Sequence, residues 1–321
     1  MTLISYQNFI GIDIGKFELS LAIHGLKQSH AYPNNPLGWK TLHKDFRSKF
    51  KDALVIVETT GGHELGLILY LQKLKINVHR ANTRQVKNFI RSLGTMAKTD
   101  HLDALALARY GCERHASLAL FKANKDAFKL YELAQRRRDL NKMMVQEKNR
   151  IQSPRLDEIV KESCQAVIAL LSQQVIQIDT HLQALIERDP ELKERQQVLE
   201  SIPGIGKVTA RDLICFMPEL GQLNHKQVAS LAGLAPHANE SGTYKGLRRI
   251  KGGRQEVRTA LFMAAMAARC SHSRFKAFYE SLIAKGKKPM VALTALMRKL
   301  IVVANARVKE MLSPPVVTEV I

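Results

Sequence analysis

The first third of the chain alternates short apolar runs with amphipathic segments. Residues 8–25 carry apolar side chains at every second position on both sides of a turn at Gly15–Lys16, which predicts two strands. The continuous apolar run at residues 53–59 predicts a buried strand, and residues 76–82 predict another. Helices are predicted at residues 34–50, 61–75, 83–94 and 99–111. This order predicts an α/β domain with a mixed sheet.

The middle of the chain has a different amino-acid composition. Residues 126–189 contain no glycine and are rich in Leu, Ile, Gln and charged residues, which predicts two long helices with a break at Ser153–Pro154. Apolar residues of the second helix recur at spacings of three and four: Val167, Leu170, Leu171, Val175, Ile178, Leu182 and Leu185. Such a stripe is typical of a coiled coil. Both an antiparallel hairpin within one chain and dimerisation fit it, and we expect a mixture of the two.

The last third is predicted to be mostly helical. Residues 199–217, "LESIPGIGKVTARDLICFM", have the pattern of a helix-hairpin-helix, in which the glycines of the turn let the backbone approach a phosphate. Lys207 follows the turn directly, which favours contact with a DNA backbone of any sequence. A glycine- and serine-containing loop, a basic segment, an alanine-rich buried helix and a closing helix at residues 287–308 are predicted to follow.

The charge of the chain indicates its partners. Over 321 residues there are 49 Lys and Arg against 29 Asp and Glu, a formal net charge of +20. The excess is +7 in residues 1–120, +2 in residues 121–190 and +11 in residues 191–321. It favours a nucleic acid over a membrane surface, because no basic amphipathic anchor stands out. No secretory leader opens the chain, and no run approaches the ~18 apolar residues of a spanning helix.

The cysteines indicate the compartment. Cys112, Cys164, Cys215 and Cys270 are scattered and form no Cys-x-x-Cys pair. This usage predicts buried, reduced thiols in a cytoplasmic protein rather than disulfides or a zinc site.

Four carboxylates form a candidate metal site. Asp13 lies among isoleucines in the first predicted strand, where an aspartate is costly to bury unless it is paired or binds a metal. Glu58 ends a predicted strand, where open α/β sheets place their ligands. Asp100 and Asp103 lie one turn apart on one face of a predicted helix. Each acid alone has an ordinary structural explanation, but a cluster of all four needs divalent cations, and oxygen ligands select Mg²⁺ or Mn²⁺. Two such ions can stabilise the attacking oxygen and the leaving oxygen when a phosphodiester bond is exchanged.

These residues resemble a known family. The order of Asp13 in "GIDIGK", Glu58 in "VETTG" and Asp100 and Asp103 in "KTDHLDA" resembles the DEDD set of RuvC-like, RNase H-fold nucleases. Together with "IPGIG" and "NESGTYKG", it resembles the DEDD insertion-sequence transposases, which include the Piv pilin-gene invertases and the bridge-RNA-guided recombinases. The resemblance implies three domains: an RNase H-like catalytic domain at residues 1–120, a helical coiled-coil spacer at 121–190 and a transposase domain at 191–321.

The resemblance also implies a nucleophile. Ser241 matches the serine that becomes transiently linked to DNA in that family, although a serine before Gly242 is by itself typical of a turn. The basic residues expected to bind nucleic acid near it are Lys245, Arg248, Arg249, Lys251, Arg254 and Arg258, with Lys207 in the helix-hairpin-helix. Such a basic stretch can hold a phosphate and stabilise charge that builds up on it.

The implied function is cutting and rejoining of DNA for a mobile element. The resemblance implies Mg²⁺ or Mn²⁺, DNA ends and target, a structured guide RNA, a homo-oligomer (dimer or tetramer) and a place in the bacterial cytoplasm near the nucleoid, with no membrane partner. A Piv-like invertase and a Holliday-junction-resolvase-like nuclease that uses water as nucleophile stay open as alternatives. The "GIDIGK" stretch also resembles an actin-like sugar kinase, and a non-catalytic nucleic-acid-binding protein is a further alternative, although neither accounts for both the charge and the acids.

Overall fold

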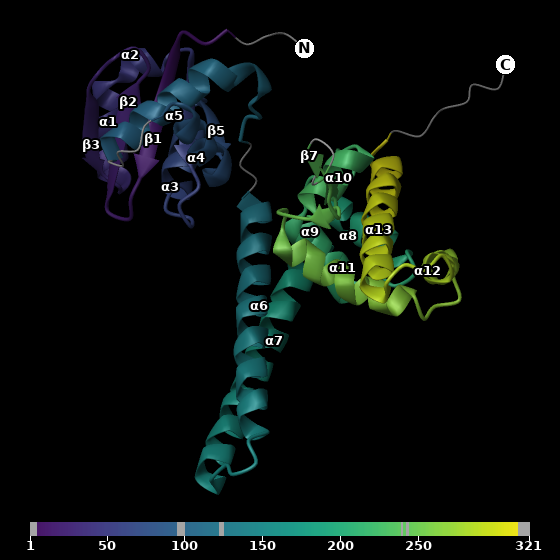
Figure 1. Ribbon diagram of the computed structural model, residues 1–321. Coiled ribbons are helices and arrows are strands. Elements are labelled where there is room, and N and C mark those ends of the chain that lie inside the picture. Colours follow the sequence, from purple (N-terminus) through teal and green to yellow (C-terminus); the bar gives the residue numbers. More distant parts are fainter. Residues whose placement is uncertain (1–4, 95–99, 122–124, 239, 242–243, 314–321) are drawn as a thin grey trace, which may run out of the picture. The chain divides into compact units, whose positions relative to one another are not determined.

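The computed structural model describes residues 5–94, 100–121, 125–238, 240–241 and 244–313. The chain divides into two compact units, Met1–Ala123 and Asn124–Ile321 (Figure 1).

The first unit is built on a five-stranded sheet in the order β3-β2-β1-β4-β5. The strands are β1 (Asn8–Ile14), β2 (Glu18–Ile23), β3 (Ser29–Pro33), β4 (Ala53–Glu58) and β5 (Asn77–Ala81). β2 runs antiparallel to β1 and β3, whereas β1, β4 and β5 are parallel, which confirms the predicted mixed sheet. Strand β3 was not predicted, because its sequence "SHAYP" lies at the edge of the sheet with no buried residue and shows no apolar alternation.

Helices cover both faces of this sheet. They are α1 (Pro36–Asp45), α2 (Arg47–Phe50), α3 (Leu65–Lys73), α4 (Thr83–Ser92) and α5 (Asp100–Arg114). Asn35 caps α1 by accepting a hydrogen bond from the Gly38 amide at 2.9 Å, and Pro36 occupies the first turn, as the sequence predicts. The predicted helix at residues 34–50 is divided at Phe46 into α1 and α2.

The two faces of the sheet carry separate apolar cores. Alternate residues of β1 and β4, such as Ile12 and Val57, pack with α1 and α3. The opposite face of β4, including Ile56, packs with α4 and α5 through Phe89 and Leu107. The face of each strand residue therefore follows from its position in the alternation.

The second unit is helical. Its helices are α6 (Lys125–Ile151), α7 (Glu158–Arg188), α8 (Pro190–Glu200), α9 (Lys207–Phe216), α10 (His225–Leu231), α11 (Gln255–Ala268), α12 (Arg274–Ala284) and α13 (Pro289–Leu312). Helix α6 ends before the predicted break at Ser153–Pro154 and α7 begins after it. The two helices lie side by side (Figure 1). Leu130, near the start of α6, and Leu182, near the end of α7, belong to the same apolar core as the C-terminal helices. The helical pair and the C-terminal part therefore form one compact unit.

The predicted apolar stripe of α7 is only partly buried. Leu171 and Leu182 are buried, but Val167 is 38% exposed and Leu170 is 58% exposed. Contacts within the chain therefore bury only some of the apolar residues in this stripe.

Helix α13 is long and apolar enough to cross a membrane by length and composition. This was not predicted, because Arg298 and Lys299 interrupt its apolar run. Its residues Leu296, Leu300 and Ala304 are fully buried in the core of the second unit. Packing in that core accounts for its apolar character.

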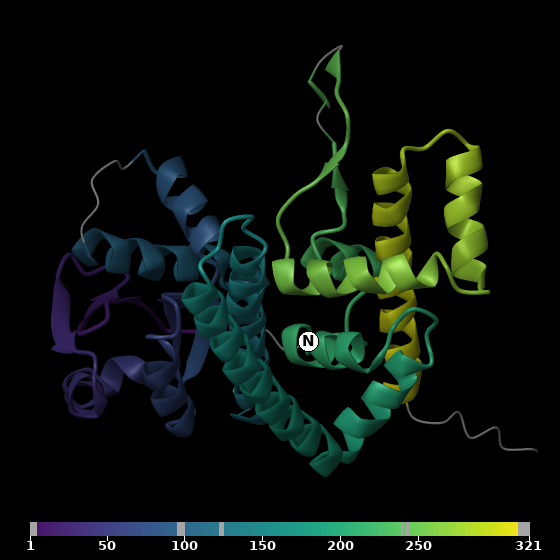
Figure 2. The ribbon, with the colours of Figure 1, turned by 90° about the horizontal axis from the view of Figure 1, so that it is seen from below.

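Between α10 and α11 the chain forms a β-ribbon in two parts. Strand β6 (Pro236–His237) pairs with β9 (Arg249–Ile250), and β7 (Glu240–Ser241) pairs with β8 (Tyr244–Lys245). Figure 2 shows the ribbon extending away from the helices. The sequence predicted a loop here, because two-residue strands are too short to show alternation.

All four cysteines are free thiols. Cys164 and Cys215 are buried, as predicted, whereas Cys112 is half-buried and Cys270 is exposed.

Candidate functional site

The register of the sheet brings two predicted acids to adjacent positions. In the parallel ladder of β1 and β4, Ile12 pairs with Val57, so the next residues, Asp13 and Glu58, follow at the same end of the two strands. Neighbouring strands lie about 4.8 Å apart, which makes these two acids neighbours across the ladder. The predicted convergence of acids therefore has a direct cause in the pairing of two apolar strands.

Both acids lie on the face of the sheet that α5 covers. Side chains two residues apart on a strand share a face, so Asp13 shares its face with Gly11 and Glu58 shares its face with Ile56. A β carbon at Gly11 would stand 2.1 Å from the carbonyl oxygen of Ala104, and a β carbon at Gly111 would stand 2.0 Å from the Cδ1 of Ile56. Gly11 and Ile56 therefore both face α5.

The same contacts give the direction of α5. Gly111 lies against Ile56 and Phe9, whereas Ala104 and Leu107 lie against Gly11. Moving from Phe9 to Gly11 along β1 thus corresponds to moving from the end of α5 toward its start. Asp103 lies one turn before Leu107, and Asp100 is the first residue of α5. The start of α5 therefore lies toward the end of β1 that carries Asp13.

The described acids have the donor chemistry of a cation site. Asp13, Glu58 and Asp103 are all half-buried, and each offers carboxylate oxygens, which suit Mg²⁺ or Mn²⁺. Within the described part of the chain, no three His, Cys, Asp or Glu side chains gather closely enough to hold a metal ion. The side chain of Asp100 lies outside the described residues, so the four-acid set stays a prediction.

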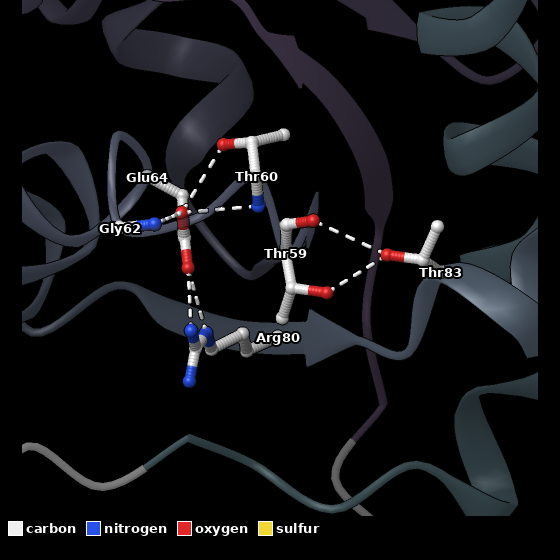
Figure 3. Close-up of polar contacts among 6 residues, drawn as sticks. All are labelled: Thr59, Thr60, Gly62, Glu64, Arg80 and Thr83. Carbon is white, nitrogen blue, oxygen red and sulfur yellow. Dashed lines mark hydrogen bonds and ion pairs between the residues drawn. The ribbon is translucent and has the colours of Figure 1, made fainter. Parts of the chain in front are cut away.

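A buried carboxylate anchors the loop that follows Glu58. Glu64, at the start of α3, has no exposed surface. Its Oε2 accepts hydrogen bonds from the amide and hydroxyl of Thr60, both at 3.1 Å, and from the amide of Gly62 at 3.0 Å. Its Oε1 accepts from Nε and Nη2 of Arg80 on β5, at 3.0 and 2.5 Å (Figure 3). The loop, α3 and β5 are thus joined through one side chain.

The charge of Glu64 is stabilised by these contacts. Burial alone would raise the pKa of the Glu64 carboxyl, but hydrogen bonds from its own amide, from Arg80 and from Thr60, together with the charge of Arg80, hold the pKa below its ordinary value. The carboxylate is therefore ionised at neutral pH in spite of its burial.

The same loop is held on its other side. The hydroxyl groups of Thr59 and Thr83 lie 2.9 Å apart, and the Thr83 hydroxyl donates to the Thr59 carbonyl at 3.2 Å (Figure 3). The amide of Thr59 donates to the Ala81 carbonyl at 3.3 Å, which extends the ladder of β4 and β5 by one bond. The backbone directly after Glu58 is consequently fixed to β5 and α4.

Asn34 joins the two loops that follow the acids. Its Nδ2 donates to the carbonyl of Gly15, two residues after Asp13, at 2.9 Å, and to the carbonyl of His63 at 3.3 Å. Its Oδ1 accepts from Nε1 of Trp39 at 2.9 Å. Asn34, Glu64 and Arg80 were not predicted from the sequence. Asn34 lies 19 residues from Gly15 and 29 from His63, Arg80 lies 16 residues from Glu64, and contacts over such separations leave no local pattern.

In the second unit, the predicted nucleophile lies in the ribbon. Ser241 pairs with Tyr244 across β7 and β8, and the side chains of Ser241 and Lys245 lie outside the described residues. Of the predicted nucleic-acid-binding residues, Arg248, Arg249 and Lys251 lie on the exposed return of the ribbon. The ribbon thus holds the serine and several cations on one short segment.

Two of the predicted nucleic-acid-binding arginines hold the base of this ribbon. Arg254 donates to both carboxylate oxygens of Glu219 at 2.6 Å and to the Phe216 carbonyl at 2.9 Å. Arg258 donates to the carbonyl of Gly252 at 2.7 Å. These contacts assign the two guanidinium groups a role inside the fold, and their predicted contact with nucleic acid is untested.

Lys207 is exposed in the first turn of α9, after the turn that joins α8 to α9. The preceding N-cap residue, Gly206, offers no side chain to cap the helix. The amides of this helix start are therefore not capped by the N-cap side chain, as the predicted anion contact requires.

Comparison with known proteins gives the family. Residues 196–280 match the family described as "Transposase IS116/IS110/IS902 family", and residues 10–160 match the DEDD transposase family of IS110 type. The pilin gene-inverting protein of Moraxella lacunata is 30% identical over 95% of this chain and 96% of its own length. An IS110 uncharacterized 43.6 kDa protein of Streptomyces coelicolor is 29% identical over 48% of this chain and 37% of its own length.

A solved structure of T. thermophilus RuvC in complex with a Holliday junction substrate is 19% identical, with a TM-score of 0.27, and covers 35% of this chain and 98% of that chain. The family rests on the sequence matches, which together extend over both units. The chain belongs to the IS116/IS110/IS902 family of transposases and is an enzyme of DNA recombination.

Proposed function

We propose that this transposase cuts and rejoins DNA with Asp13, Glu58, Asp100 and Asp103 as metal-binding acids and Ser241 as nucleophile. The observation that carries the role of the acids is that Asp13 and Glu58 are neighbours on the face of the sheet that α5 covers. The start of α5 lies toward the same end of these strands. The strand order, with β2 alone antiparallel, supports an RNase H-like domain. The role of Ser241 rests on the resemblance of "NESGTYKG" to the family's motif.

The proposed reaction is a pair of transesterifications. The Ser241 hydroxyl attacks a phosphorus atom of DNA, a phosphorus–oxygen bond of the strand breaks, and the departing DNA oxygen takes up a proton while Ser241 loses one. A DNA hydroxyl then loses its proton and attacks the same phosphorus atom, the bond between phosphorus and the Ser241 oxygen breaks, and that oxygen takes up a proton. A bound Mg²⁺ or Mn²⁺ would neutralise charge on the phosphate. The four acids would hold that cation, and the basic side chains of the ribbon that carries Ser241 would orient the phosphate.

The proposed nucleic-acid contacts are Lys207, Lys245, Arg248, Arg249 and Lys251. The first lies at an open helix start and the others in the ribbon that carries Ser241. Arg254 and Arg258 hold the base of this ribbon, and the contact of these two arginines with nucleic acid stays a prediction. The net charge of +20 supports a second polyanion, a structured guide RNA, beside the DNA.

The proposed working unit is a homo-oligomer in the bacterial cytoplasm, at the nucleoid. Exposed apolar side chains of α7, including Leu170 at 58% and Ile176 at 66%, support association through the helical pair. In functional terms we divide the chain into a catalytic domain at residues 1–120, a spacer at 121–190 and a transposase domain at 191–321.

Site-specific inversion is the second candidate function. It is favoured by the 30% identity with the pilin gene-inverting protein over nearly the whole of both chains. The chemistry is the same, and the arrangement of the DNA sites decides between inversion and transposition. A resolvase-like nuclease would use the same acids with water and would not need Ser241.

The test uses the full chain with Mg²⁺, RNA from the flanks of its element and a DNA that carries the element junction. Products are separated on a denaturing gel to detect a protein–DNA adduct. An adduct that is lost in both Ser241→Ala and Asp13→Ala supports the proposal. Cleavage without an adduct that persists in Ser241→Ala shows a nuclease that uses water.

A further inference from the structure

We propose that Glu64 is a positioning residue for the metal-binding carboxylate of Glu58, acting through the loop at residues 59–62. This inference rests on the proposed function, because it assumes that Glu58 holds a cation. Glu64 itself has no exposed surface and touches neither DNA nor cation in this proposal.

Glu64 is a buried charge whose hydrogen-bond contacts lead to the loop and to Arg80. A buried carboxylate is costly unless hydrogen bonds and an opposite charge compensate it. Here one oxygen accepts three hydrogen bonds from the loop and the other accepts two from Arg80. An apolar residue at the start of α3 would avoid this cost, whereas the carboxylate that is present bonds the loop at three donors.

The loop needs such an anchor because its backbone is permissive. Gly61 and Gly62 have φ angles of 73° and 107°, and a β carbon at either glycine would meet nothing within 4 Å. Two adjacent glycines in open space can adopt many conformations. The bonds from Glu64 to Thr60 and Gly62 bracket this glycine pair, while the contacts of Thr59 with Thr83 fix the residue next to Glu58. Figure 3 shows the two sets of contacts on opposite sides of the loop.

The fold of the unit does not depend on this anchor alone. Strand β4 is held by ladders with β1 and β5, and α3 is held by Leu67, Ile68 and Leu71, which are fully buried. Loss of the Glu64 carboxylate should therefore release the loop locally and leave the sheet in place. The direction of the Glu58 carboxylate, at the last position of β4, is the property expected to change.

The test compares Glu64→Ala with Leu71→Ala, a cavity variant on the same helix that does not touch the loop. Three measurements are made on the full chain: Mn²⁺ affinity from the electron paramagnetic resonance of free Mn²⁺, amide hydrogen exchange at residues 59–62, and unfolding by urea. Residues that support metal ligands typically change metal affinity by about 10–100-fold. We expect Glu64→Ala to weaken Mn²⁺ binding within that range and to speed exchange in the loop. Glu64→Gln, which keeps one acceptor oxygen, should lie between Glu64→Ala and the wild type.

Three outcomes decide the inference. Weakened Mn²⁺ binding in Glu64→Ala, with wild-type binding in Leu71→Ala, supports it. Wild-type Mn²⁺ binding in Glu64→Ala, or equal weakening in both variants, overturns it while the proposed function stands. Mn²⁺ binding by the wild type that is unaffected by Asp13→Ala overturns the proposed function itself, and this control is measured first.

Discussion

The backbone of Gly11 lies so close to α5 that a β carbon there would stand 2.1 Å from the carbonyl oxygen of Ala104. Only glycine permits this approach, because real β carbons do not come within 3.0 Å of such atoms. The contact fixes how deeply α5 lies on the sheet, and with it the start of the helix that carries Asp100 and Asp103. A small residue inside an apolar strand thereby sets how closely α5 approaches the strand that carries Asp13.

Gly11→Ala should force α5 away from the sheet. Overpacking a well-packed core costs about 1–3 kcal/mol, and we expect the upper part of that range because backbone atoms of α5 are in the way. The unfolding of the first unit is followed in urea by the fluorescence of Trp39, the single tryptophan of the chain. Formation of the proposed protein–DNA adduct should be lost in the same variant, since the acids on α5 are displaced.

The matched control is Gly25→Ala. Gly25 has a φ angle of 88° and free space around it, so alanine there costs only the left-handed conformation, about 1 kcal/mol. Equal destabilisation by the two variants would contradict the close approach of α5.

The sheet could be predicted from the sequence because its pattern is local. Alternating apolar residues around Asp13 and the continuous apolar run that ends at Glu58 are characteristic of strands that form the middle of a sheet. Parallel pairing of such strands then places their carboxyl ends together. The position of the two acids followed from these patterns, whereas the edge strand β3, with polar residues and no buried face, did not.

Long-range polar contacts could not be predicted in the same way. Arg254 looked like one more cation in a basic segment, but its partner, Glu219, lies 35 residues earlier. Asn34 looked like a helix-start residue, although Asn35 is the residue that caps α1. In both cases the residue type indicates a capacity for hydrogen bonding, and only the fold determines which partner satisfies it.

Asn34→Ala should uncouple the loops that follow Asp13 and Glu58. It removes hydrogen bonds to the Gly15 and His63 carbonyls and leaves the indole N–H of Trp39 without its acceptor, which we expect to cost about 2 kcal/mol. Trp39 fluorescence should change in the folded state. The neighbouring cap variant Asn35→Ala should cost about 1 kcal/mol without affecting the loops. If adduct formation at a temperature where both variants are folded falls equally in the two, the proposed coupling is wrong.

Arg249→Ala and Arg254→Ala should have different effects on DNA binding. Arg249 is exposed on the ribbon, so Arg249→Ala should remove one phosphate contact and weaken binding to any duplex. The slope of the logarithm of affinity against the logarithm of salt concentration should decrease by about 1. Arg254 is paired with Glu219, so Arg254→Ala should instead lower the stability of the second unit. Affinity for a fixed duplex is measured at several salt concentrations, and stability is measured by circular dichroism.

Glu219→Gln is the companion variant for Arg254. It weakens the same ion pair without removing a cation, and it should reproduce the loss of stability seen in Arg254→Ala. A change in salt dependence in Arg254→Ala, with no loss of stability in either variant, would assign Arg254 to the DNA surface after all.

The stability of the first unit should fall as the pH drops below about 6.5, the ordinary pKa of histidine. Burial lowers the pKa of His79 on β5, and its hydrogen bond with the Ala119 carbonyl, at 2.7 Å, offsets this only in part. Burial and the charge of Arg47 lower the pKa of His43 in the same direction. Below the unfolded pKa, these histidines bind protons more readily in the unfolded chain than in the folded chain. Their contribution to the free energy of unfolding is therefore fully present above the unfolded pKa and is lost as the pH decreases. Urea unfolding followed by Trp39 fluorescence between pH 8 and pH 5 measures this loss. His79→Phe, which keeps a ring beside Tyr110, should make the pH dependence shallower, and an unchanged profile would show that His79 is protonated equally well in the folded chain.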